Sequence, residues 1–190
     1  MLKLLREINM KKSIRVLIVF LFVLSLFLVN YCFAQCITLT LGSGQGQQGA
    51  TISLDLNLSG SNLVSGFQLD IQYDINALEN LTASKGVSLV SADKDLSTSF
   101  PQTGVFRLVA AGVNKNTIPP GKVATISFKI KSDAPLGISQ LTLTNLVVTD
   151  VNGNSLTTTS NNGSVTVEEG HLPFCSFLGG ICLELSLIHI

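Results

Sequence analysis

The chain has no tryptophan among its 190 residues, and only 6% of its residues are aromatic. Proteins that bind crystalline polysaccharides stack sugar rings on exposed aromatic side chains, so the absence of tryptophan disfavours that function. Histidine is nearly as scarce, since His171 and His189 are the only two. A Ser–His–Asp triad or a histidine-rich metal site would depend on them, and we therefore expect no enzyme activity, no metal and no cofactor.

Charged residues are also few, at 13% of the chain, and the formal net charge is zero. The charges are distributed unevenly. Five of the twelve basic residues and one of the twelve acidic residues lie in residues 1–34, which leaves 7 basic and 11 acidic residues, a net charge of −4, in the rest. Nucleic acids and anionic membrane surfaces bind clustered positive charge, so we expect neither as a partner of this part.

The first segment has the pattern of a secretory signal peptide. Basic residues between Lys11 and Arg15 precede an uncharged run over residues 16–29, and a small residue stands at the expected cleavage site after Ala34. We expect residues 1–34 to be the signal peptide, with 1–9 as an upstream extension, of a bacterial protein that is secreted or held at the cell surface. The alternative is an uncleaved anchor, although the run is shorter than the about 20 apolar residues that span a bilayer.

The C-terminal end carries two further expectations. Residues 185–190 match the translation of a transposon-end adapter used for sequencing libraries, so we interpret them as an artefact that follows a truncated gene. Residues 169–184 would then be a tail or the start of a missing segment, which could also attach the protein to a membrane. In an oxidising compartment a disulfide between Cys175 and Cys182 is expected, which would leave Cys36 as a free or intermolecular thiol.

Alternation of apolar and polar residues predicts a β-sandwich. In residues 66–74, Phe67, Leu69 and Ile71 alternate with polar residues, which is typical of a strand with one face in the core and one in water. We predict an all-β, antiparallel sandwich of jelly-roll type, with about nine strands over residues 35–168. The strands are expected at residues 37–41, 51–58, 66–73, 87–91, 105–111, 123–131, 140–149, 155–158 and 163–167, with a single helical turn at 75–78.

The order of these segments resembles the cohesin domain family. The resemblance runs through residues 49–54, 66–74, 106–110, 121–130, 150–154 and 163–167. It implies a nine-stranded jelly-roll sandwich, related in fold to a group of carbohydrate-binding modules, that binds dockerin modules through one sheet face. It also implies a secreted, non-catalytic scaffolding module of an extracellular or cell-surface assembly. Family members offer Asn and Asp side chains to the dockerin at the positions that Gly66 and Gln68 occupy here.

The candidate binding residues lie on the strand face that is expected to point to solvent. Gln68, Asp70 and Gln72 form a polar row, and Arg107 from another predicted strand could join it. A flat polar sheet surface can dock a protein partner, which is a dockerin or another protein. The same row would also suit the solvated side of an ordinary antiparallel sheet.

Direct carbohydrate binding is the alternative function, because related sandwiches serve it. Phe67, Tyr73, Phe106 and Phe128 all fall at inward-facing positions, so they would not form a sugar-stacking row. Phe100, Phe174 and Phe177 do not fall in a single row, which leaves only a loop site for a soluble glycan.

The segment Asp150-Val151-Asn152-Gly153-Asn154 resembles part of a calcium loop. An EF-hand loop has glycine at its sixth position and glutamate at its twelfth, whereas here glycine is fourth and Asn161 is twelfth. We therefore predict a tight type I′ hairpin turn at Asn152-Gly153 and no metal site. Dockerins carry two calcium loops, so a single partial copy indicates that this chain is not itself a dockerin.

Overall fold

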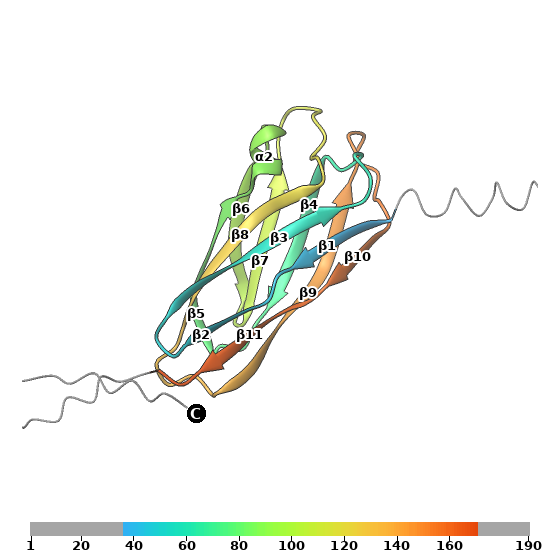
Figure 1. Ribbon diagram of the computed structural model, residues 1–190. Coiled ribbons are helices and arrows are strands. Elements are labelled where there is room, and N and C mark those ends of the chain that lie inside the picture. The colour runs from blue at the N-terminus through green and yellow to red at the C-terminus, as the bar shows by residue number, and fades with distance from the viewer. Residues whose placement is uncertain (1–35, 171–190) are drawn as a thin grey trace, which may run out of the picture.

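The computed structural model describes residues 36–170, which fold into two packed β-sheets with one short helix (Figure 1). Among these residues, no helix is long and apolar enough to cross a membrane. The elements are β1 (Ile37–Leu41), β2 (Gly44–Gln47), β3 (Thr51–Ser59), β4 (Gly66–Gln72), β5 (Leu78–Lys85), α2 (Val87–Ser91), β6 (Asp95–Gln102), β7 (Val105–Ala111), β8 (Gly121–Ile130), β9 (Gly137–Thr149), β10 (Thr158–Asn161) and β11 (Gly163–Glu168).

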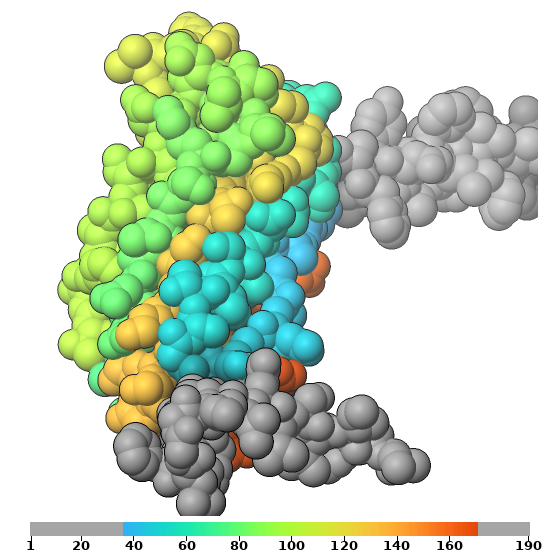
Figure 2. Space-filling model, turned by 60° about the vertical axis from the view of Figure 1, so that its left-hand side comes forward, coloured from blue at the N-terminus to red at the C-terminus, as the bar shows by residue number. Residues whose placement is uncertain are grey.

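The strands form one sheet of five and one sheet of six. The five-stranded sheet has the order β10-β1-β3-β8-β5, and the six-stranded sheet has the order β2-β11-β9-β4-β7-β6. Figure 2 shows the outer surface of the five-stranded sheet, where β8 in gold lies beside β3 in cyan. The predicted all-β sandwich is confirmed, with eleven strands among the described residues rather than about nine.

The core lies between the two sheets and is built by the predicted alternation. Phe67, Leu69 and Ile71 of β4 are buried, and Phe106 of β7 and Phe128 of β8 are among the largest fully buried side chains. These residues meet apolar side chains of β1, β3 and β11 in a single cluster. Burial of this apolar surface is the main favourable contribution to folding, and it fixes which side of each strand faces outwards.

The terminal strands depart from the predicted antiparallel arrangement. β1 pairs in parallel with β10, and β2 pairs in parallel with β11, while the other pairs are antiparallel. The chain thus passes from one sheet to the other between β1 and β2 and again, alongside, between β10 and β11. At this crossing the backbone amide and the hydroxyl of Ser164 both bond to Ser43 Oγ. Sequence alternation carries no information on strand direction, so the parallel pairs were not predictable from it.

All four edge strands and one helix also differ from the prediction, and β10 covers residues 158–161 instead of 155–158. β2, β5 and β6 lack a regular apolar–polar alternation, because β2 alternates only glycine with glutamine, β6 buries little surface, and a bulge between Glu79 and Thr82 interrupts β5. Residues 87–91 were predicted as a strand but form the helix α2. Leu89 is fully buried there, whereas Val87 and Val90 are exposed, so packing of one side chain outweighs the strand preference of valine.

Of the two predicted turns, the first forms as expected and the second is of a different type. Residues 75–77 are a hydrogen-bonded turn in which Asp74 Oδ1 accepts the Asn76 amide at 2.8 Å, as expected of a capping aspartate. The hairpin after β9 is not of type I′, because only Gly153 has a positive φ, of 82°. Asp150 Oδ1 instead accepts the amides of Asn152 and Asn154, at 2.8 and 2.9 Å.

Candidate functional site

The predicted binding residues meet on the outer side of the six-stranded sheet. β4 lies between β7 and β9, and its outward residues Gln68, Asp70 and Gln72 pair in register with outward residues of both neighbours. Arg107 lies directly opposite Asp70. We call this surface the β4 face, and it consists of Gln68, Asp70, Gln72, Val105, Arg107, Val109, Thr142, Thr144, Asn145 and Val147.

The expectation that Asp70 faces open water is wrong. Its side chain is only 2% exposed, because Arg107 lies across it: Arg107 Nε donates to Asp70 Oδ1 at 2.6 Å and Nη2 donates to Oδ2 at 2.7 Å. This two-bond geometry is the strongest form of the arginine–carboxylate pair. Asp70 is therefore the buried half of an ion pair, and Arg107, which is 31% exposed, is the half that a partner would meet.

The contacts of the pair hold both groups in their charged forms. Hydrogen bonds from Arg107 and from Asn145, with the positive charge of Arg107, lower the pKa of Asp70 despite its burial. The hydrogen bond to Asp70 raises the pKa of Arg107 in turn. A carboxylate that accepts several N–H groups is stable in its ionised form, so the pair stays charged at neutral pH.

Asn145 is a member of this site that sequence reasoning missed. Its Nδ2 donates to Asp70 Oδ2 at 2.7 Å, and its φ is +50°. It occupies a bulge, since one residue of β4, Leu69, faces the two residues 145 and 146 of β9. A signal was present: the apolar residues Leu141 and Leu143 are followed by Leu146 and Val148, so the alternation slips by one residue at Asn145.

The end of the β4 face around Gln68 is less polar than the end around Gln72. Gln68 is half-buried and pairs in register with Val109 of β7 and Val147 of β9, and Val147 is 47% exposed. Gln72, at the other end of β4, is exposed. The four predicted residues thus do lie on one surface, but they differ in availability: Gln72 is exposed, Arg107 and Gln68 are half-buried and Asp70 is enclosed.

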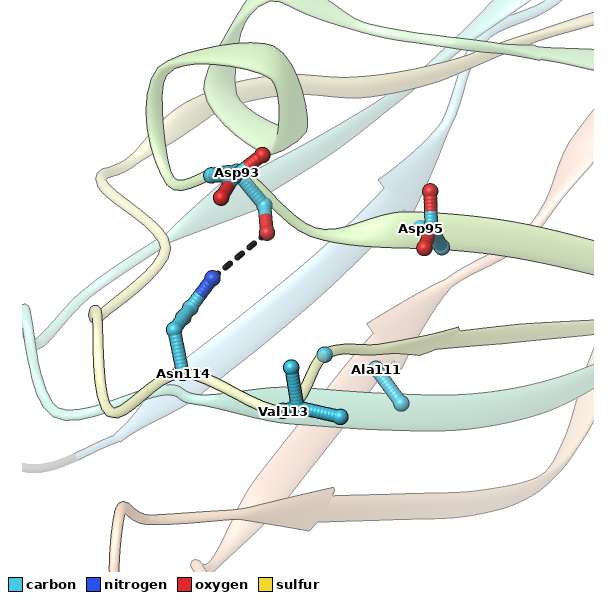
Figure 3. Close-up of a pocket in the computed structure, with 6 residues that line it drawn as sticks. Asp93, Asp95, Ala111, Val113 and Asn114 are labelled. Atoms are coloured by element: carbon cyan, nitrogen blue, oxygen red, sulfur yellow. Dashed lines mark hydrogen bonds between the residues drawn. The ribbon is translucent and has the colours of Figure 1, made fainter.

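An open pocket of about 500 Å³ lies where β6 begins and β7 ends. Asp93, Asp95, Val113 and Asn114 line it, and Asn114 Nδ2 donates to the Asp93 carbonyl oxygen at 2.6 Å (Figure 3). Lys85 Nζ contacts Asp95 at 3.2 Å. Of the residues that line this pocket, none is a histidine, serine, cysteine or lysine, so the lining itself holds no such nucleophile and no histidine base.

Next to this pocket, Lys94 is buried with 1% exposure. Its Nζ donates to Ser65 Oγ at 3.2 Å and to the Asn114 carbonyl oxygen at 3.0 Å. Lys94 thereby joins the loop before β4 to the loop after β7.

The other sequence-based candidates lie elsewhere. Within residues 36–170, no group of three or more His, Cys, Asp or Glu side chains could hold a metal ion. Phe100 is 56% exposed, but its ring packs against Phe106 at a centroid distance of 5.0 Å. The expected signal peptide, the Cys175–Cys182 disulfide, Phe174 and Phe177 lie outside the described residues and stay predictions.

Comparisons with known structures give the same fold. The solution structure of CaCohA2 from Clostridium acetobutylicum is 24% identical, with a TM-score of 0.62, and the match covers 74% of this chain and 95% of that chain. The cohesin in the Coh-OlpA–Doc918 cohesin–dockerin complex from Clostridium thermocellum is 16% identical, with a TM-score of 0.63 and coverage of 70% and 99%. A non-cellulosomal cohesin from the archaeon Archaeoglobus fulgidus is 18% identical, with a TM-score of 0.59 and coverage of 70% and 91%.

No curated protein matches this sequence. The family model of the cohesin domain, however, matches residues 37–167, from the first residue of β1 to within one residue of the end of β11. The cohesin domain is a non-catalytic binding module, which agrees with the expectation that the chain is not an enzyme. The chain belongs to the cohesin domain family.

Proposed function

We propose that this protein is a secreted scaffolding module that docks a dockerin-type protein on its β4 face, within an extracellular or cell-surface assembly. The observation that carries the proposal is the composition of that face. An ion pair that is already satisfied, Arg107 with Asp70, lies beside the half-exposed valines Val109 and Val147.

This composition resembles the centre of a protein interface more than a solvated sheet surface. Interface centres are poor in charged residues and enriched in arginine and apolar side chains. On the β4 face, Asp70 and Arg107 are the only charged residues, and they neutralise each other. A partner can therefore cover this face without leaving either of these two charges buried and unpaired, which would otherwise cost several kcal/mol.

The face is also rigid, because it belongs to the central strands of a sheet. β4 is bonded on both sides, to β7 and to β9, and the side chains beneath it are fully buried. Docking onto such a surface requires little backbone change, so little ordering entropy is lost on binding.

The test measures binding to displayed libraries built on the dockerin Doc918, with its surface residues randomised, in the presence of calcium. Binders selected with the protein are then assayed against Val147→Arg, which places a charge on the β4 face, and against Val87→Arg, the same change on α2. We expect Val147→Arg to weaken binding at least tenfold and Val87→Arg to leave it unchanged.

Three results would contradict the proposal. One is that no dockerin-based binder emerges, and another is that Val87→Arg weakens binding as much as Val147→Arg does. A third is that soluble polysaccharides retard the protein in affinity electrophoresis while no dockerin variant binds, which would favour a carbohydrate-binding module instead.

A further inference from the structure

Asp70 is poorly placed to recognise a partner, because it is enclosed and three of its about four acceptor positions are occupied. It accepts two N–H groups from Arg107 and one from Asn145, all at 2.6 to 2.7 Å, and its side chain is 2% exposed. Asp70 and Asn145 instead hold the guanidinium of Arg107 in one orientation. Fixing a long side chain in advance removes most of the entropy that a partner would otherwise have to offset.

The guanidinium retains unused donors on its other side. Arg107 bonds to Asp70 through Nε and Nη2, and within the described residues Nη1 donates to no acceptor. The side chain is 31% exposed. The two terminal nitrogens of a guanidinium match the spacing of the two oxygens of a carboxylate, so this open end can form a second two-bond pair.

The surroundings of Arg107 favour a negatively charged group over a positive one. In register, Arg107 lies between Asp70 of β4 and Ser99 of β6, and no other cation lies on the β4 face. The carboxylate of Asp70 is enclosed, so the positive end of the pair is the one exposed to a partner. A lysine or arginine of a partner would meet this positive group without an accessible counter-charge, which is unfavourable at a desolvated interface.

We propose that Arg107 is the anchor of the β4 face and that the docked protein presents an aspartate or glutamate carboxylate to its open end. This proposal rests on the proposed function and specifies the chemistry of the partner. The carboxylate would lie over the Asp70–Arg107 pair, with Val109 and Val147 providing the neighbouring apolar contacts.

The experiment selects dockerin-based binders with the protein, as above, and sequences their randomised surface positions. The selected binders are titrated against the protein, Arg107→Gln, Arg107→Lys and Lys129→Gln. Lys129 is a matched control, because it is a paired surface cation on the outer side of the other sheet, with Nζ 3.2 Å from Glu79. Asp70→Asn combined with Arg107→Gln removes both charges, so that a loss of binding cannot be ascribed to an orphaned buried carboxylate.

We expect the binders to be enriched in Asp or Glu at one surface position. Binding should fall at least tenfold for Arg107→Gln and for the double variant, less for Arg107→Lys, and not at all for Lys129→Gln. Changing the selected acid to its amide should weaken binding to the original protein but not to Arg107→Gln.

The failures of the two proposals are distinguishable. Binders without an enriched acid, whose affinity changes less than threefold on Arg107→Gln, would overturn the anchor and leave docking on the β4 face intact. The absence of any dockerin-based binder would overturn the proposed function, and the anchor with it.

Discussion

Gly163 passes so close to the carbonyl oxygen of Gly42 that a Cβ at position 163 would overlap it, and would also lie 2.9 Å from Leu41 Cγ. The contact lies where both ends of the domain cross between the sheets. Since the Gly42 carbonyl belongs to the backbone, it cannot turn aside as a flexible side chain could. The crossing therefore requires glycine at position 163 for space, whatever its backbone conformation.

We predict that Gly163→Ala lowers the free energy of unfolding by about 2 kcal/mol, the usual cost of forcing an extra carbon into a packed site. Ser164→Ala is the control, because it loses only the hydroxyl contact with Ser43 Oγ at 3.2 Å and should cost less than about 1 kcal/mol. Urea unfolding followed by circular dichroism measures both. Equal losses of stability for the two substitutions would show that the close approach of Gly163 to the Gly42 carbonyl does not set the cost.

Asp70→Asn should make stability less dependent on pH. The pKa of Asp70 is lowered in the folded protein, so its contribution to stability is complete above the unfolded pKa of about 4 and is lost as the pH falls through the folded pKa. At pH 7 the substitution should cost about 2 kcal/mol, through lost hydrogen bonds to a charged group.

The difference between Asp70→Asn and the original protein should shrink as the pH falls below about 4, in urea titrations at a series of pH values. Asp133→Asn makes the same charge change at an exposed position and serves as the control. If the difference in the free energy of unfolding stays constant down to the lowest pH, the carboxylate charge does not contribute to stability.

Asn145 can be separated into its two roles by two substitutions. Asn145→Gly keeps the positive φ accessible but removes the bond to Asp70 Oδ2, whereas Asn145→Ala removes the bond and also strains the backbone. We expect the free energy of unfolding to fall by about 1 kcal/mol for the glycine variant and by about 2 kcal/mol for the alanine variant. If alanine were tolerated better than glycine, the bulge would not need the left-handed conformation at residue 145.

Much of the fold follows from alternation in single strands. β4, β7 and β8 were predicted closely, because each lies inside a sheet and buries one side, so that apolar residues recur at every second position. The edge strands β2 and β6 bury little and carry no such pattern. Sequence patterns thus predict the central strands well, and the edges and the strand directions poorly.

The β4 face was predicted in part for a similar reason. Alternation placed Gln68, Asp70 and Gln72 on one side of β4, which is correct. It could not show that Arg107 lies opposite Asp70, because register between strands separated by 37 positions depends on the whole sheet. The enclosure of Asp70 is a property of that register and not of the β4 sequence.

Lys94 provides a test of how the end of the sandwich near α2 is held. Lys94→Met keeps most of the side-chain volume but leaves Ser65 Oγ and the Asn114 carbonyl without the ammonium, so we expect a loss of about 1 to 3 kcal/mol. Lys94→Ala should cost more, because it also leaves a cavity. Lys115→Met, at an exposed position in the same loop as Asn114, should be neutral in thermal unfolding. A neutral Lys94→Met would mean that the hydrogen bonds of the ammonium do not stabilise these loops.

The parallel pairing of the terminal strands has a mechanical consequence. β1 begins and β11 ends at opposite ends of the sandwich (Figure 1). Tension applied through these ends pulls β1 and β2 one way and β10 and β11 the other, along the direction of the strands. The bonds of both parallel ladders then bear the load together instead of opening one after another.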